Sequence, residues 1–231
     1  MAALSEYLEI DEVCFQLAQG KQKVVAVTSA NSGEGVSTIA CALAERCQKA
    51  GKHTLLVDMN YHRPSLHKKY NLQRGVWQCG ETASSAIHKV GGHLSVLPAS
   101  LTLDKSLREP DLLTEQLRNW QQSFDAIVFD TSPLNAINRH NLAAEQACAA
   151  AGSTLVVLQA AVTKEADILE ALAKLKSHKA NIAGWVMNDL CCPALASEMQ
   201  REVKRLARYA PRFARWLERK ILQNDFINQV M

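Results

Sequence analysis

The sequence predicts a doubly wound α/β domain with a mostly parallel sheet, and two observations support this prediction. Short apolar runs rich in β-branched residues recur along the chain, and segments with helical spacing of apolar residues lie between them. Runs of this length, bounded by polar residues, are typical of strands buried on both faces of a parallel sheet. Because such folds bind ligands beyond the carboxyl ends of their strands, we expect the chemistry there.

Six runs are expected to form strands, in chain order residues 23–29, 53–59, 94–98, 125–131, 153–159 and 182–188. Apolar residues three and four positions apart predict helices after the first run and before the last, over residues 39–47 and 166–175. We therefore expect three parts: a helical lead-in over residues 1–22, the α/β domain over 23–197 and basic amphipathic helices over 198–231.

Composition excludes several classes of protein. The chain has 231 residues, of which 48% are apolar and 21% charged, and this balance is typical of one globular domain rather than a disordered, collagen-like or membrane protein. No apolar stretch approaches the roughly 20 residues of a membrane span. The acidic start MAALSEYLEIDEV has neither the basic beginning nor the apolar core of a signal peptide. We therefore expect a cytoplasmic protein.

The seven cysteines show no metal-ligand spacing, and most stand among apolar residues. Reduced core thiols are the expected state. They are Cys14, Cys41, Cys47, Cys79, Cys148, Cys191 and Cys192. Redox activity of the adjacent pair Cys191 and Cys192 is the less favoured alternative, because adjacent cysteines bridge only with strained geometry.

A phosphate-binding loop is predicted between the first strand and the following helix, where the chain reads SANSGEGVST over residues 29–38. Glycines let successive backbone N–H groups face a phosphate, and the helix N-terminus adds partial positive charge. Against the pattern G-x-x-x-x-G-K-[ST], Ala30 is an accepted variant, Gly35 and Ser37 fit, and Val36 does not. Taken alone, a loop that departs this far from the pattern is more often an ordinary strand-to-helix turn.

Two carboxylates strengthen the prediction of a phosphate site. Asp58 ends the second predicted strand and Asp130 ends the fourth, so both are expected beside the loop. A single aspartate at a strand end is more often a helix cap than a metal ligand. Three elements of a phosphate site in the right order favour a site that holds Mg²⁺ and nucleotide.

The run over residues 24–67, together with residues 94–100, 124–133, 152–172 and 184–190, resembles the bacterial tyrosine kinases (BY-kinases) of capsular and exopolysaccharide biosynthesis. These kinases form a branch of the MinD/ParA group of P-loop ATPases. The resemblance implies a P-loop NTPase fold that uses ATP or ADP with Mg²⁺. It implies Asp58 and Asp130 as catalytic residues and Ser37, Asp58 and Asp130 as metal ligands. The implied nucleotide-binding residues are Ala30, Asn31, Ser32, Gly33, Glu34, Gly35, Val36, Ser37, Thr38, Arg63 and Asn188, the last of these against adenine.

The departures from the family pattern predict a degenerate member. Val36 stands in place of the phosphate-binding lysine, Asn31 in place of the signature lysine of MinD-type loops, and Asn60 in place of the second aspartate. Residues 9–18 lack the family's oligomerisation motif, which leaves ring assembly unsupported, and the C-terminal tyrosine cluster is missing. Weak or absent adenine-nucleotide binding is therefore expected. Arg63 is an alternative source of positive charge, or simply part of a turn.

The segment over residues 198–231 holds eight basic and four acidic residues, and its arginines recur three and four positions apart opposite an apolar face. Packing on the sheet, docking of residues 198–221 to an anionic membrane surface, and binding of a membrane-embedded partner remain open. Nucleic acid is not an expected partner, since no recognised module is present.

The leading interpretation is a regulatory or scaffolding component of exopolysaccharide or capsule export, placed in the cytoplasm at the inner face of the inner membrane. Its expected partner is an inner-membrane polysaccharide co-polymerase or a related export protein, as the resemblance implies. One alternative is an active ATPase or tyrosine kinase completed by a residue from elsewhere or by a membrane activator. The other is a MinD/ParA-like membrane-associated positioning ATPase.

Overall fold

The computed structural model describes residues 4–19, 23–102, 110–136 and 142–189, with isolated positions at 203, 205–207, 213 and 217. The chain divides into two compact units, one of Met1–Leu158 with Val162–Met187 and one of Gln159–Ala161 with Asn188–Met231. The fold and the candidate site belong to the first unit. Most of the predicted basic segment lies outside the described residues.

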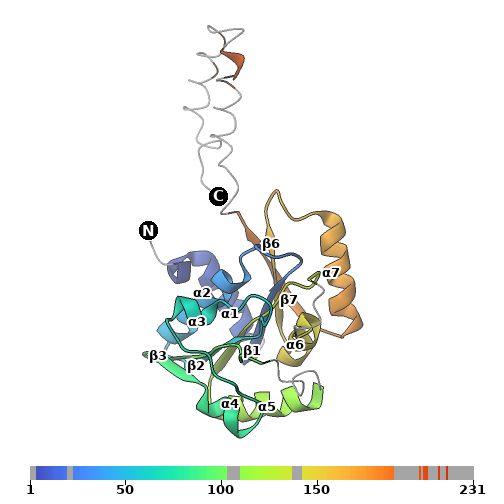
Figure 1. Ribbon diagram of the computed structural model, residues 1–231. Helices are drawn as coiled ribbons and strands as arrows, with labels where there is room; N and C mark the ends of the chain where they lie inside the picture. The colour runs from blue at the N-terminus through green and yellow to red at the C-terminus, as the bar shows by residue number, and fades with distance from the viewer. Residues whose placement is uncertain are drawn as a thin grey trace. The chain divides into compact units, whose positions relative to one another are not determined.

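The strands and helices alternate as the sequence predicts (Figure 1). The strands are β1 Val24–Ser29, β2 Thr54–Asp58, β3 His88–Gly91, β4 Leu94–Leu97, β5 Ala126–Asp130, β6 Thr154–Gln159 and β7 Ile182–Asn188. The helices are η1 Leu4–Glu6, α1 Leu8–Gln19, α2 Val36–Lys49, α3 Leu66–Lys69, α4 Glu81–Ser85, α5 Pro110–Ser123, α6 Ala144–Ala151 and α7 Glu165–Ser177.

The described strands form one sheet in the order β3-β4-β2-β5-β1-β6-β7. β1 pairs in parallel with β5 and β6, and β2 pairs in parallel with β4 and β5. β3, which was not predicted from the sequence, is antiparallel to its neighbour β4. The doubly wound, mostly parallel sheet is thereby confirmed, and it sets the ends of β1, β2 and β5 side by side.

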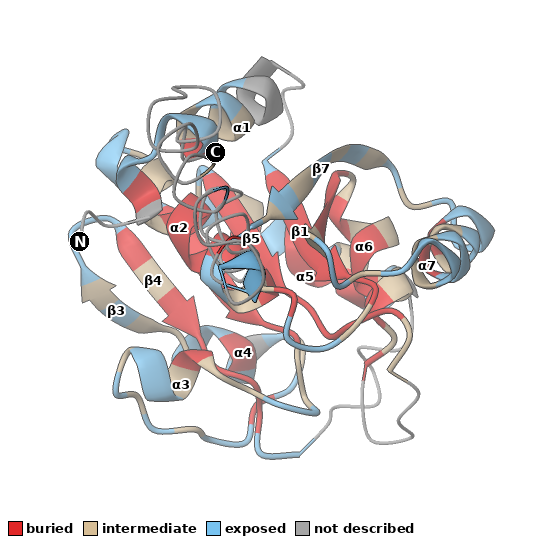
Figure 2. Cartoon of the chain, turned by 90° about the horizontal axis from the view of Figure 1, so that it is seen from above, coloured by how far each residue is buried: buried red, intermediate tan, exposed pale blue. Residues whose placement is uncertain are grey.

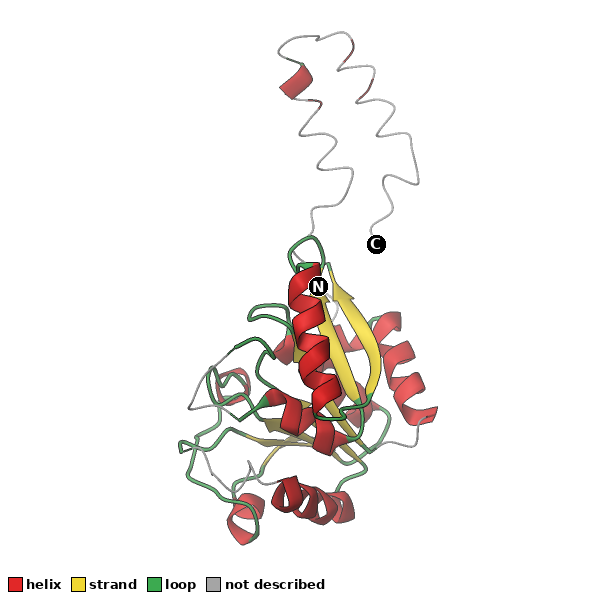
Figure 3. Ribbon diagram, turned by 90° about the vertical axis from the view of Figure 1, so that its right-hand side faces the viewer, coloured by secondary structure: helices red, strands yellow, loops and turns green. Residues whose placement is uncertain are grey.

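The central strands β1, β2 and β5 are buried on both faces of the sheet. Successive side chains of a strand point to opposite faces, and each face packs into its own core cluster. Val24 and Ala26 pack into a core cluster with α5, α6 and α7, whereas Val25 and Val27 pack into a second cluster with α2. Figure 2 shows the buried strands, and Figure 3 shows them between helices. Burial on both sides explains why these strands read as continuous apolar runs.

Helix α2 follows the predicted loop directly. Gly35 is its N-cap, in a left-handed conformation with φ 102°, and Val36 is its first residue. The helix forms because apolar residues recur on the face that packs on β1, β2 and β5. Arg46 and Lys49 lie in the last turn, where positive charge is favourable to the helix dipole.

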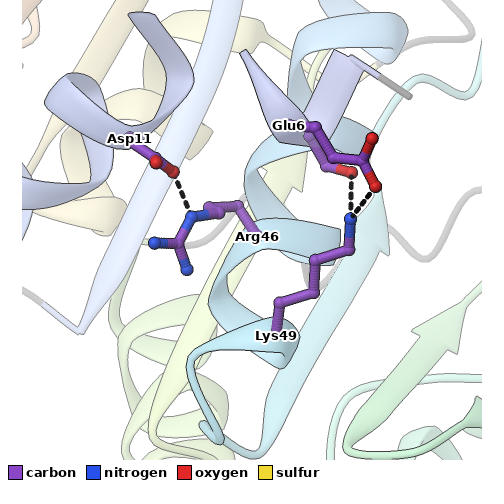
Figure 4. Close-up of polar contacts among 5 residues, drawn as sticks. Glu6, Asp11, Arg46 and Lys49 are labelled. Atoms are coloured by element: carbon purple, nitrogen blue, oxygen red, sulfur yellow. Dashed lines mark hydrogen bonds and ion pairs between the residues drawn. The ribbon is translucent and has the colours of Figure 1, made fainter. Parts of the chain in front are cut away.

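The lead-in helices η1 and α1 pack against α2. Ile10 is buried in the cluster on that face. Ion pairs also join the lead-in helices to α2. Arg46 bonds Asp11, and Lys49 Nζ lies 3.0 Å from Glu6 Oε1 (Figure 4). All four of these side chains are partly exposed, and exposed ion pairs contribute little to stability. The lead-in is therefore held mainly by a small apolar contact.

Among the residues that the structure describes, no helix has the length and apolar character needed to cross a membrane. The described cysteines are free thiols. Cys41 and Cys148 are buried as expected, whereas Cys14, Cys47 and Cys79 are only half-buried. Cys191 and Cys192 lie outside the described residues.

Candidate functional site

The loop between β1 and α2 has the backbone of a phosphate cradle. Gly33 has φ 91° and Gly35 has φ 102°, which favour glycine. A Cβ added at Gly33 would meet nothing within 4 Å, so backbone conformation rather than space requires glycine there. The Ile39 N–H donates to the Gly35 carbonyl at 3.0 Å. The amides of residues 36–38 therefore form the positive N-terminus of α2, where anions bind.

A buried carboxylate braces this loop from within. Glu34 is 2% exposed, and its carboxylate accepts the Asn31 N–H at 3.1 Å and the Thr163 hydroxyl at 2.6 Å. The Asn31 amide nitrogen donates to the Asp167 carboxylate at 2.9 Å. Asn31, which stands at the position of the signature lysine, thus makes a structural hydrogen bond. Thr163 and Asp167 were missed by sequence reasoning, because no motif marks them.

The side chain of Val36 turns into the core. It is 9% exposed and belongs to the same cluster as Val27 and Ile39. No positive charge reaches the loop from this position. The neighbouring Ser37 is half-buried, and its hydroxyl hydrogen-bonds the Asp130 carboxyl.

Asp58 anchors the segment that follows β2. Its carboxyl is fully buried and accepts three backbone N–H groups, from Asn60 at 3.1 Å, Ser65 at 3.1 Å and Leu66 at 3.2 Å. Burial raises the pKa of Asp58 above its usual range, and the three N–H groups oppose that rise. Asp58 therefore stabilises the turn that follows β2, independently of any role as a metal ligand.

The residues after Asp58 make a tight turn. The Asn60 carboxamide oxygen accepts the Arg63 N–H at 3.0 Å, so the residue in place of the second aspartate closes the turn. The Arg63 side chain is exposed.

Asp130 is the cross-strand partner of Asp58 and is fully buried. The Ser65 hydroxyl donates to its Oδ2 at 3.4 Å, whereas its buried Oδ1 has no hydrogen-bond partner among the described residues. Burial and then the charge of Asp58 raise the pKa of Asp130, and the hydrogen bonds from Ser37 and Ser65 lower it. Ser65 was also missed by sequence reasoning, although a serine before a helix is a known signal for a cap.

The structure thus brings together Ser37, Asp58 and Asp130, the residues predicted to hold a metal. Among the described residues no group of three histidine, cysteine or acidic side chains could hold one. The predicted set is of a different kind, because it has two carboxyls and one hydroxyl. Asn188 ends β7 and belongs to the second unit, where its carbonyl accepts the Ala160 N–H at 2.9 Å.

Positive charge reaches the two carboxyls from the segment after β2. Lys69 lowers the pKa of Asp130, and its Nζ lies 3.4 Å from Glu45 Oε1. Arg74 lowers the pKa of Asp58. The guanidinium of Arg74 is itself committed to the chain, since it donates to carbonyl oxygens of residues 99 and 100 at 2.8 and 2.7 Å.

Comparison with known proteins identifies the family and the fold of this chain. A family model described as an AAA domain matches residues 22–183. The chain is 31% identical over 192 residues to the tyrosine-protein kinase YwqD of Bacillus subtilis, with 75% of each chain covered. It is 28% identical over 190 residues to the tyrosine-protein kinase CpsD of Streptococcus pneumoniae, with 76% of this chain and 79% of the relative covered.

Solved structures share the fold at low sequence identity. The kinase domain of the Escherichia coli tyrosine kinase ETK has a TM-score of 0.64 at 16% identity, over 77% of this chain and 71% of that one. The septum site-determining protein MinD of Pyrococcus horikoshii, solved with Mg-ADP, has a TM-score of 0.58 at 17% identity, over 72% and 70%. The chain therefore belongs to the bacterial tyrosine kinase family, within the MinD/ParA-like group of P-loop NTPases.

Proposed function

We propose that this chain is a degenerate BY-kinase that binds adenine nucleotide weakly, no longer transfers phosphate, and regulates or scaffolds capsule or exopolysaccharide biosynthesis and export. One observation carries the proposal. Val36 is buried at the first turn of α2, where the family's motif places a lysine, while Ser37, Asp58 and Asp130 remain assembled. The metal side of the site is kept and the phosphate-binding cation is lost.

The residues present suit Mg²⁺ and a nucleotide phosphate. The buried Asp130 Oδ1 without a partner is an acceptor suited to a cation, and the Ser37 hydroxyl lies beside the same carboxyl. Ser37, Asp130 and the remaining acceptor capacity of Asp58 would hold Mg²⁺, which prefers oxygen ligands. The loop amides and the α2 N-terminus would hold phosphate. When bound, Mg²⁺ supplies neutralisation of phosphate charge.

Phosphoryl transfer needs more than binding. Charge spreads over the transferred phosphate, and the loss of one stabilising group costs roughly 10²–10⁵ in rate. Val36 cannot supply a cation, and Asn60 is neutral and closes a turn. Two such losses leave a site that binds without efficient chemistry.

The partner follows from the family rather than from a surface of this chain. Its relatives are named tyrosine-protein kinases, and the chain spans three quarters of YwqD. The proposed partner is an inner-membrane polysaccharide co-polymerase or a related export protein, met at the inner face of that membrane. The basic segment over residues 198–221 would contribute contact with that partner or with anionic lipid.

A second candidate is an active ATPase or kinase whose missing lysine is replaced from elsewhere. Lys69 favours it, because the ammonium group already acts on Asp130 from α3. In that case Lys69→Ala would abolish nucleotide turnover. The salt bridge between Lys69 and Glu45 opposes this second candidate, because it already pairs the ammonium group with a carboxylate on α2.

Calorimetric titration with ATP and with ADP, each with Mg²⁺, tests the leading proposal. We compare the wild type with Asp130→Ala and with Asp111→Ala, a matched control at an exposed position in the first turn of α5. Saturable binding that Asp130→Ala loses and Asp111→Ala keeps is the expected result. No heat up to millimolar nucleotide would overturn the binding part. Steady release of ADP that Asp130→Ala abolishes would overturn the loss of chemistry.

A further inference from the structure

The thiols of Cys14 and Cys47 meet across the contact between the lead-in helix α1 and the loop-bearing helix α2. The two side chains are hydrogen-bonded to each other. Both are half-buried, and both line a small cavity of about 40 Å³ at the rim of the sheet. Two hydrogen-bonded thiols on neighbouring helices, beside one shared cavity, are a candidate pair for a disulfide.

The charges around the pair separate the roles of the two thiols. The hydrogen bond from Cys14 lowers the pKa of the Cys47 thiol to about 7 against the opposing effect of burial, and Lys52 and Arg46 act in the same direction. The pKa of Cys14 is raised far above its usual range, first by the hydrogen bond with Cys47 and then by burial. Cys47 therefore carries the thiolate and Cys14 the proton, the pairing of attacking and resolving thiols.

The other buried thiols differ. Burial raises the pKa of Cys41 and raises that of Cys148 to about 12. Thiols of this kind are poor nucleophiles near neutral pH. Cys79 packs against the core cluster on the opposite face of the sheet from Cys14.

We propose that Cys14 and Cys47 form a reversible disulfide, driven by a hydroperoxide, that ties the lead-in helix to α2. The Cys47 thiolate attacks the peroxide oxygen, which breaks the O–O bond, and the leaving oxygen takes up a proton to depart as water when the peroxide is hydrogen peroxide. The Cys47 sulfenic acid is then attacked by the Cys14 sulfur. The S–O bond breaks, the thiol proton leaves with the oxygen as a second water, and the S–S bond forms. Two thiols lose two electrons and the peroxide gains them.

The bridge matters because the polar contacts between the lead-in and α2 include partly exposed ion pairs. They include the pair of Arg46 with Asp11 and, from the adjoining η1, the contacts of Lys49 with Ser5 and Glu6. Salt screens such pairs. A covalent link would keep the lead-in docked on α2, whose N-terminus forms the phosphate cradle. The oxidant thereby sets whether the lead-in can leave, independently of nucleotide.

The test treats the full chain with stoichiometric hydrogen peroxide, then blocks free thiols and maps digested peptides by mass spectrometry. The matched variants are Cys14→Ser, Cys47→Ser and Cys79→Ser. We expect a dithiothreitol-sensitive linked peptide holding residues 14 and 47 in the wild type and Cys79→Ser, and in neither of the other two. Oxidation should raise the melting temperature by about 5 °C where the bridge forms.

A second measurement needs no variant. Iodoacetamide should label Cys47 of the reduced native protein about tenfold faster at pH 7 than Cys41 or Cys148. Oxidation of Cys47 to a sulfinic acid without a linked peptide would overturn the proposal. So would a linked peptide that joins Cys47 to another cysteine in the wild type.

Discussion

Asp58 and Asp130 are cross-strand partners at the ends of β2 and β5, and both carboxyls are fully buried. They differ in what surrounds them. Asp58 accepts three backbone N–H groups, whereas Asp130 is bonded by hydroxyls and keeps one oxygen without a partner among the described residues. Asp58 thus holds the segment over residues 60–66 in place. Asp130 has the unsatisfied buried oxygen that a bound cation would pair with.

The buried carboxyls should make the free energy of unfolding depend on pH. Both pKa values are raised by burial, so the folded chain binds more protons than the unfolded chain near neutrality. Their contribution is fully present below the ordinary aspartate pKa and is lost as pH rises through the raised values. In EDTA, urea unfolding should show a stability lower at pH 8 than at pH 5 by more than about 1 kcal/mol.

Asp130→Asn serves as the comparison for that prediction. It removes the carboxyl with the unpartnered oxygen while keeping its shape. The variant should gain stability at pH 8 and little at pH 5. A gain of equal size at both pH values would show that ionisation of Asp130 is not the cause.

Asp58→Ala should destabilise the chain, in contrast to the change at Asp130. The N–H groups of Asn60, Ser65 and Leu66 would lose their acceptor, at a cost of about 2 kcal/mol or more. Urea unfolding gives the cost, and hydrogen exchange should increase at residues 60–66. Asp58→Asn, which keeps one oxygen, should lose less. Unchanged exchange in the alanine variant would show that the segment is held by other contacts.

Val36→Lys should raise the affinity for ATP with Mg²⁺ about tenfold or more, because a cation returns to a cradle that already has its backbone shape. Calorimetry measures the change. Val36→Met is the uncharged control of similar length, and it should show no gain. Since Val36 packs in the core, thermal unfolding of both variants checks that they are folded. Equal affinity in all three proteins would mean that the cradle does not accept phosphate.

The basic segment is tested by replacing Arg205, Arg208 and Arg212 with glutamate. Sedimentation with vesicles that contain anionic lipid should fall to the level seen with neutral vesicles, because the charge that attracts the surface is reversed. The control for net charge replaces three exposed lysines of the α/β domain with glutamate, which changes the net charge by the same amount. They are Lys89, Lys176 and Lys179. Loss of sedimentation in the control as well would trace binding to overall charge.

The six predicted strands are confirmed. Five of them, β1, β2, β4, β5 and β6, are apolar runs that are wholly or mostly buried, and such a run is a local property of the sequence. β7 alternates between half-buried and exposed residues, but its seven residues still form a run long enough to be recognised. β3 escaped prediction because it is both short and partly exposed. It has four residues, His88–Gly91, which alternate between half-buried and exposed, and it pairs antiparallel at the edge of the sheet. A short edge strand leaves little pattern to read.

The sequence by itself determined where six of the strands lie, that a glycine loop follows the first of them, that Val36 occupies the lysine position, and that Asp58 and Asp130 stand at strand ends. Only the tertiary structure decided how those groups are held. Glu34 is braced by Thr163, 129 residues away, and Ser65 links Asp58 to Asp130. The physical reason is that periodicity and motif spacing record contacts within one element. The strand order sets which distant side chains meet, and no local pattern encodes it.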